Sequence, residues 1–199
     1  MNICTLPGTT IEADLCSTSV ADKLLDPMFF GGGLVLSQVS SLTGLQPHVI
    51  QNWVKRGFVS PPKSKKYTKR QFCRIAIINF LKDSLQIDRI VKLISFINPN
   101  LSDESDSIID DSVLYSFFVD VISLISPQGN LDSNKIDGAI ERVLKNQNKY
   151  KISEKVNISR VIKIMVLIYA AEIRKKQAEL LLSPSKSISP STISGSSAS

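Results

Sequence analysis

The stretch QNWVKRGFVSPPKSKKYTKRQ, residues 51–71, predicts three local structures in succession. Gly57 can adopt the positive φ angle that ends a helix, so a helix is expected to finish there. The two prolines at 61–62 exclude helix from the connection that follows. Thr68, with Gln71 three residues later, is typical of a capping box and predicts the start of the next helix. This stretch therefore predicts a helix, a short extended connection and a second helix.

The residues on either side extend this pattern. Upstream, a helix beginning near Ser37 is expected to end at Gly44, and a second helix to run from Pro47 to Gly57, since proline is favoured in a first helical turn. Two short helices separated by a glycine turn form a helix-turn-helix pattern. Residues 58–67 are then a small wing. After the helix that starts at Thr68, a further helix is expected over residues 87–97.

Positive charge is concentrated in the same region. The chain has a formal net charge of +6, yet no acidic residue lies between Asp26 and Asp83, where the segment carries +9 and leaves −3 for the rest. A solvated face normally mixes charges of both signs, because unpaired like charges repel. Phosphate groups would supply the missing counter-charge, which favours a nucleic acid as partner. The nine basic residues are Lys55, Arg56, Lys63, Lys65, Lys66, Lys69, Arg70, Arg74 and Lys82.

The helix expected over residues 47–56 has two distinct faces. One face is apolar, with Ile50 and Trp53, and is expected to dock the helix. The opposite face carries four polar residues at spacings of three and four, which are His48, Gln51, Asn52 and Lys55. Gln and Asn side chains can each form paired hydrogen bonds with adenine in the major groove. Taken alone, the four residues fit an ordinary solvated helix face at least as well; the adjacent cations shift the interpretation toward nucleic acid.

Residues 36–94, LSQVSSLTGLQPHVIQNWVKRGFVSPPKSKKYTKRQFCRIAIINFLKDSLQIDRIVKLI, resemble the winged helix-turn-helix of MerR-type bacterial transcription regulators. They look closest to an uncharacterised bacterial branch, a domain of unknown function with this module at its N-terminus. The matching motifs are LTGL at the turn, NWVKRGFV from the second helix into the wing, PP and KKY along the wing, and SLQIDRIVKLI. The broad family usually carries Arg where Gln51 stands, and its long dimerisation helix has no direct counterpart because Pro99 ends the fourth helix.

The resemblance implies that Gln51, Asn52 and Lys55 face the groove and that Lys63, Lys65, Lys66 and Tyr67 hold the DNA backbone. The helix pattern and the run of cations add His48 to the first set and Arg56, Lys69 and Arg70 to the second. The base-reading side chains would be His48, Gln51, Asn52 and Lys55. The side chains that hold the DNA backbone would be Arg56, Lys63, Lys65, Lys66, Tyr67, Lys69 and Arg70. Trp53 and Phe58 would form the core of the module.

We expect a mainly α-helical protein: an N-terminal MerR-like winged helix-turn-helix, a small C-terminal helical unit and disordered termini. The expected segments are a flexible stretch at 1–33, the DNA-binding domain at 34–97, an acidic linker at 98–111, a helical unit at 112–182 and a disordered Ser-rich tail at 183–199. The unit at 112–182 is expected to dimerise or to sense a ligand, and a homodimer through these residues is possible.

The sequence argues against catalysis, metal binding and membrane insertion. His48 is the only histidine, and Cys4, Cys16 and Cys73 share no metal-ligand spacing, so we expect no metal, no cofactor and no catalytic residues. The odd cysteine count and the missing signal peptide and membrane span favour a cytoplasmic protein. We therefore expect a DNA-binding transcriptional regulator whose partner is double-stranded DNA. The alternative is a non-enzymatic adaptor that docks an acidic protein on the basic module.

Overall fold

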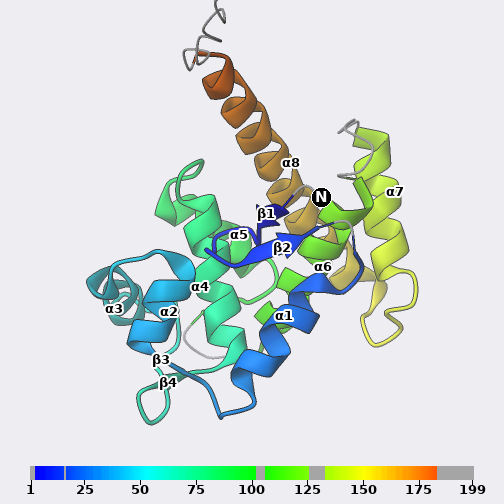
Figure 1. Ribbon diagram of the computed structural model, residues 1–199. Helices are drawn as coiled ribbons and strands as arrows, with labels where there is room; N and C mark the ends of the chain where they lie inside the picture. The colour runs from blue at the N-terminus through cyan, green and yellow to red at the C-terminus, as the bar shows by residue number, and fades with distance from the viewer. Residues whose placement is uncertain (1–2, 16, 102–105, 126–132, 183–199) are drawn as a thin grey trace, which may run out of the picture.

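The computed structural model describes residues 3–15, 17–101, 106–125 and 133–182, and it confirms a mainly helical protein (Figure 1). The strands are β1 (Ile3–Thr5), β2 (Glu12–Asp14), β3 (Leu34–Val35) and β4 (Lys66–Tyr67). The helices are α1 (Val20–Phe29), α2 (Leu36–Thr43), α3 (Pro47–Lys55), α4 (Lys69–Leu81), α5 (Ile87–Ser95), α6 (Asp111–Ile125), α7 (Ser133–Leu144) and α8 (Ile152–Leu182). The expected tail at 183–199 and part of the expected linker, 102–105, lie outside the described residues.

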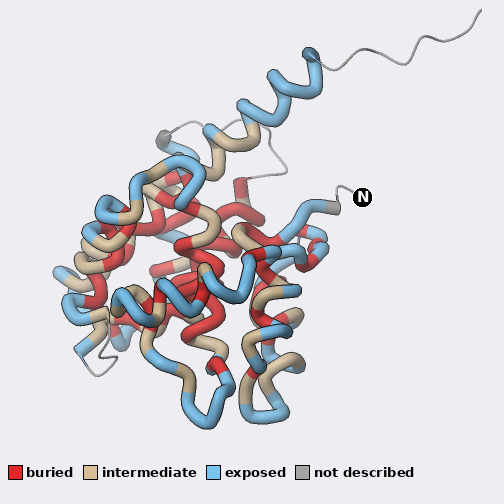
Figure 2. The backbone as a smooth tube through the Cα atoms, turned by 90° about the vertical axis from the view of Figure 1, so that its left-hand side faces the viewer, coloured by how far each residue is buried: buried red, intermediate tan, exposed pale blue. Residues whose placement is uncertain are grey.

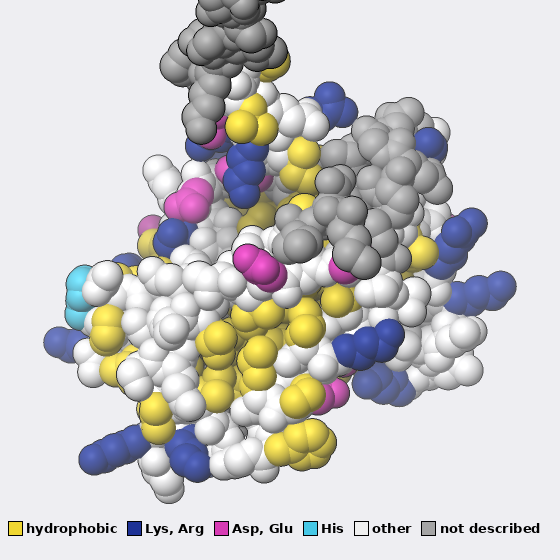
Figure 3. Space-filling view, viewed as in Figure 1, with side chains coloured by type: hydrophobic (Ala, Val, Ile, Leu, Met, Phe, Trp, Pro, Cys, Tyr) yellow, Lys and Arg dark blue, Asp and Glu magenta, His cyan; other side chains and the backbone are white. Residues whose placement is uncertain are grey.

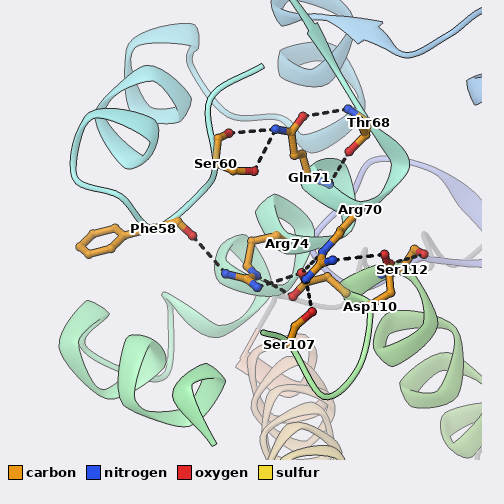
Figure 4. Close-up of polar contacts among 10 residues, drawn as sticks. Phe58, Ser60, Thr68, Arg70, Gln71, Arg74, Ser107, Asp110 and Ser112 are labelled. Atoms are coloured by element: carbon orange, nitrogen blue, oxygen red, sulfur yellow. Dashed lines mark hydrogen bonds and ion pairs between the residues drawn. The ribbon is translucent and has the colours of Figure 1, made fainter. Parts of the chain in front are cut away.

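Helix α4 lies at the centre of the fold, and its start confirms the predicted capping box. The Thr68 hydroxyl accepts a hydrogen bond from the Gln71 backbone N–H at 3.2 Å, and the Gln71 side-chain oxygen accepts one from the Thr68 backbone N–H at 2.9 Å. The Gln71 amide nitrogen also donates to the backbone carbonyls of Ser60 and Pro61, both at 3.0 Å. Gln71, the second residue of the capping box, therefore also holds the segment Ser60–Pro61 that follows α3 (Figure 4).

The connection between α3 and α4 differs in detail from the expected wing. Gly57 has φ 74°, and the Phe58 backbone N–H donates to the Trp53 carbonyl at 2.9 Å, which ends α3 as predicted. The only regular strand in the connection is β4, which pairs antiparallel with β3, upstream of α2, with Leu34 opposite Tyr67. Val59, which was expected to belong to the wing, is buried in the core, where its apolar side chain is removed from water.

The expectation of flexible coil at residues 1–33 is wrong for the described part of that segment. β1 and β2 pair as an antiparallel hairpin, α1 follows, and the side chains of Leu6 and Leu25 are fully buried. Gly8 has φ 73°, and a Cβ there would meet the Ala76 carbonyl oxygen, so the loop between β1 and β2 lies directly on α4. Pro7 and Gly8 in fact form a tight turn that packs closely, and Pro27 lies inside α1.

The acidic linker expected at 98–111 is also wrong for the part of it that the structure describes. Asp111 is buried with 2% of its surface exposed, and it forms the first residue of α6. α6 packs against α4 and α1, while α7 and α8 pack against α6. Buried residues from both halves of the chain form one continuous core (Figure 2). The described helices therefore fold as one body and not as two units joined by an exposed linker.

A buried ion pair joins α4 to α6 (Figure 4). The Arg74 guanidinium donates two hydrogen bonds to the Asp111 carboxylate, from Nε at 2.6 Å and from Nη2 at 2.8 Å. Its third nitrogen, Nη1, donates to the backbone carbonyl of Phe58 at 3.4 Å. Arg70 shares the same carboxylate, with Nε 3.2 Å from Asp111 Oδ2. One carboxylate thus ties α6 to α4, and through Arg74 to the chain leaving α3.

We predict that Arg74→Met lowers the free energy of unfolding by about 3–5 kcal/mol, because it leaves the Asp111 carboxylate buried without its main partner. The double variant Arg74→Met/Asp111→Leu is expected to regain most of that stability, since no buried charge remains. The matched control is Lys163→Met, which removes the half-exposed pair with Asp137 and is expected to cost under about 1 kcal/mol. Urea unfolding followed by circular dichroism measures all three, and equal losses would contradict the prediction.

Candidate nucleic-acid interface

The exposed face of α3 carries the four side chains that the sequence singled out. His48, Gln51, Asn52 and Lys55 are all exposed, and their spacing of three and four residues places them along one side of the helix. On the other side, Ile50 is fully buried and Trp53 is 6% exposed. The apolar side chains thus fix the helix on the core, and the polar row faces solvent.

The turn between α2 and α3 is held by contacts from two other parts of the fold, the N-terminal hairpin and α4. Gly44 ends α2 with φ 70°, the left-handed conformation that a glycine adopts without steric cost. The Thr10 backbone N–H donates to the Leu42 carbonyl at 2.8 Å, so the N-terminal hairpin caps α2. The Asn79 amide of α4 donates to the carbonyls of Gly8 and Thr43, both at 2.9 Å. α3 is therefore presented on a fixed base.

The turn Lys63–Lys66 between α3 and α4, called the hairpin below, presents three exposed lysines. The Lys66 backbone N–H donates to the Lys63 carbonyl at 2.9 Å, which closes a two-residue turn. The two residues inside it, Ser64 and Lys65, have φ 49° and 63°. A left-handed conformation costs a non-glycine residue roughly 1–2 kcal/mol. Lys63, Lys65 and Lys66 are all exposed, so the strained turn holds its charged side chains in solvent.

Three of the expected backbone-binding residues are engaged in the fold. Tyr67 is buried with 3% of its surface exposed, because β4 turns this side chain into the core. Lys69 Nζ donates to Asp22 Oδ1 at 2.7 Å and to Asp26 Oδ1 at 2.5 Å, both on α1. Burial alone would lower the pKa of Lys69, but these two carboxylates raise it above its usual value. The Arg70 side chain contacts Asp111 and the Ser107 hydroxyl. We therefore remove Tyr67, Lys69 and Arg70 from the expected interface.

The cations that the fold leaves exposed lie on α3 and the hairpin. They are Lys55, Arg56, Lys63, Lys65 and Lys66. Over the described part of the chain, none of them forms an ion pair with a carboxylate. The Arg56 guanidinium lies 4.5 Å from the centre of the Phe58 ring, and Lys66 Nζ donates to the Gly31 carbonyl at 3.0 Å. Figure 3 shows Lys and Arg side chains at the lower left, around β3 and β4, without Asp or Glu beside them.

Sequence reasoning missed two residues on which the geometry depends, Arg74 and Asn79. Both lie in α4 within QFCRIAIINF, an otherwise mostly apolar run. A charged or amide side chain in such a run must find a buried partner, because an unpaired polar group in the core is costly. That rule could have identified both side chains as structural. It could not have identified their partners, which lie 16 to 71 residues away.

The described residues give little support for a metal site, a reactive cysteine or a membrane-spanning helix. No group of three His, Cys, Asp or Glu side chains in the described residues lies together as a metal site would require. Cys73 is fully buried, and burial raises the pKa of its thiol well above the ordinary value, which makes it a poor nucleophile. None of the described helices combines the length and apolar character needed to cross a lipid bilayer.

Comparison with known proteins gives a match to a protein-family model. No curated protein and no solved structure matches the chain. A family model described as "Domain of unknown function (DUF1836)" matches residues 31–118, from the glycine loop before β3 to the middle of α6. The match thus includes Asp111 and extends beyond residue 97, where the sequence alone suggested that the first unit ends. Residues 31–118 of this chain thus match the family model of a domain of unknown function, in keeping with the uncharacterised domain that the sequence suggested.

Proposed function

We propose that this protein binds double-stranded DNA and regulates transcription, with α2, α3 and the hairpin turn Lys63–Lys66 acting as a MerR-like winged helix-turn-helix. The observation that carries the proposal is the exposed polar row of α3, which ends in Lys55 and is flanked by four further exposed cations. None of these five cations has a carboxylate partner among the described residues. DNA offers both of the partners that such a surface lacks, namely base edges for the polar row and phosphates for the cations.

The polar row of α3 suits the major groove in shape and chemistry. From His48 to Lys55 it spans about 10 Å at the helical rise of ~1.5 Å per residue, which corresponds to roughly three base pairs. Gln51 and Asn52 lie in the middle of the row and can each form a bidentate contact with adenine. His48 and Lys55 lie one turn to either side and can reach neighbouring bases or the edge of the groove.

The cations suit the two backbones that border the groove. Lys55 and Arg56 lie at the C-terminal end of α3, and Lys63, Lys65 and Lys66 lie on the hairpin. Such contacts carry no sequence information, but they supply affinity that falls as salt rises. We assign base reading to His48, Gln51, Asn52 and Lys55, and phosphate contact to Arg56, Lys63, Lys65 and Lys66.

The first test is selection of bound duplexes from a random pool, repeated across a salt series. We expect an enriched motif, and a plot of log affinity against log salt with a slope of about −3 to −4 if the four cations assigned to the backbone contact phosphates. Binding without an enriched motif would contradict base reading. No binding to any duplex would overturn the proposal and favour an acidic protein as the partner of the same surface.

Two sets of variants separate the roles of α3 and the hairpin. Gln51→Ala and Asn52→Ala are each expected to weaken binding to the selected motif by roughly 5- to 100-fold and to change base preference. Lys65→Asn is expected to weaken binding to all duplexes and to make the salt slope shallower by about one. Asn tolerates the left-handed conformation of this position, so the fold should be unaffected.

The control for these variants is Lys145→Asn, which removes an exposed lysine at the end of α7, outside the proposed interface. It should leave affinity, motif and salt slope unchanged, and thermal melting of every variant should match the wild type. Equal losses on every sequence from the α3 and hairpin variants would refute the assignment of Gln51 and Asn52 to the bases.

We also propose that the protein forms a homodimer through its C-terminal helices. The last turn of α8 carries three exposed leucines, Leu180, Leu181 and Leu182, and the helix projects beyond the body of the molecule (Figure 1). Burial of these side chains against a second copy would remove apolar surface from water, at about 25 cal/mol per Å². A dimer would present two copies of α3 to two half-sites.

Sedimentation equilibrium tests the dimer. We expect the wild type to be dimeric and Leu181→Glu to shift it to monomer, because the charge would be buried in the contact. Ile152→Glu, at the opposite end of α8 and equally exposed, is the matched control and should remain dimeric. A wild-type monomer at high concentration would contradict this proposal without affecting DNA binding by one copy.

A further inference from the structure

Phe30 is the one exposed aromatic side chain in the part of the chain that the structure describes. Its exposed fraction is 88%, whereas the other Phe, Tyr and Trp residues are buried or half-buried. It immediately follows α1 and precedes the glycine loop Gly31–Gly33 that leads into β3. Nothing in the core or in the proposed base-reading helix accounts for an outward phenyl ring at this position.

The backbone that carries Phe30 is fixed against the hairpin. Lys66 Nζ donates to the carbonyl of Gly31, the residue next to Phe30. A Cβ on Gly33 would approach the Tyr67 carbonyl oxygen to 2.7 Å, so the loop lies flush against β4. β3 then pairs with β4, with Val35 opposite Lys66. Phe30 is therefore held beside the hairpin lysines.

The end of α1 adds a second anchor. The ring of Phe29 packs against Phe72 of α4, with centroids 5.8 Å apart, and the Gly32 backbone N–H donates to the Phe29 carbonyl at 3.1 Å. With Phe29 turned inward, Phe30 points outward. Asp26, one helical turn earlier, shares Lys69 with Asp22, so one ammonium group offsets part of the charge of two carboxylates near the ring.

The chemistry of this arrangement matches a DNA wedge. Several proteins insert a Phe, Leu, Ile, Met or Pro side chain between base pairs in the minor groove, which unstacks the step and bends the duplex. An apolar protein partner would instead call for a contiguous patch of several hundred Å². Met28 and Phe29, the neighbours of Phe30, are half-buried and packed against the core, so a single large apolar side chain projects.

We propose that Phe30 inserts into a base step of the minor groove beside the phosphates held by the hairpin lysines. This inference rests on the proposed function, since the ring can reach a base step only when the hairpin is on DNA. The Phe30 contact would depend on how easily a base step unstacks, whereas the α3 contacts depend on the hydrogen-bonding groups of the bases. Steps of the pyrimidine–purine type, which kink easily, would be favoured at that position.

The experiment uses the full chain and a duplex selected by the wild type, with 2-aminopurine placed at each step in turn and a fluorophore pair at the ends. Wild type should raise 2-aminopurine fluorescence at one step outside the α3 motif and shorten the end-to-end distance. Phe30→Ala should abolish both signals and weaken binding by roughly 5- to 100-fold, as expected for lost base stacking. Its salt slope should be unchanged, because no phosphate contact is removed.

Two further variants serve as controls. Phe30→Leu keeps an apolar wedge and should retain most of the bend, while Val35→Ala, an exposed apolar residue on β3, should behave as wild type. Wild-type binding with no unstacking signal, or Phe30→Ala binding and bending DNA like wild type, would overturn the wedge and leave the proposed function intact. Failure of the wild type to bind any duplex would overturn both.

Discussion

The buried ion pair between Arg74 and Asp111 is the constraint on which the rest of the arrangement depends. A buried charge is tolerated only when its partner and its remaining hydrogen bonds are in place, so this pair allows one placement of α6 on α4. Arg74 also donates to the Phe58 carbonyl, at the point where the chain leaves α3. The same side chain therefore positions the C-terminal helices and the root of the hairpin. The DUF1836 match, which ends within α6, includes both partners of the pair.

Folding divides the basic residues of the central segment into two groups. Carboxylates from α1 and from the start of α6 neutralise the cations of α4, as the contacts of Lys69 with Asp22 and of Arg74 with Asp111 illustrate. No carboxylate of the described residues reaches the cations of α3 and the hairpin. The proposed interface is thus what remains after the structural pairs have formed. Charge that is continuous along the sequence becomes a localised surface only in three dimensions.

The N-terminal segment takes part in the proposed interface as a structural element. Thr10 caps α2 from the β1–β2 hairpin, and the Asn79 amide joins that hairpin to the last residue of α2. These contacts hold the turn that sets the direction of α3. At the other end of the same segment, the glycine loop holds Phe30 against β4. The residues before β3 thus support α3 and also supply the ring that we propose as a wedge.

The sequence by itself determined the elements whose signals are local. The capping box of Thr68 and Gln71, the stop at Gly57 and the two-faced pattern of α3 each depend on residues within a turn or two, and the structure has all three. Only the tertiary structure reveals the ordered fold of the described residues before β3, the burial of Tyr67 and the partners of Lys69, Arg70 and Arg74. Each depends on contacts between segments far apart in the chain, such as the 47 residues that separate Lys69 from Asp22. Backbone conformation can be predicted from a local sequence pattern because it is set largely by residues adjacent in the chain. The pairing of charges cannot, because it depends on which surfaces the folded core brings together.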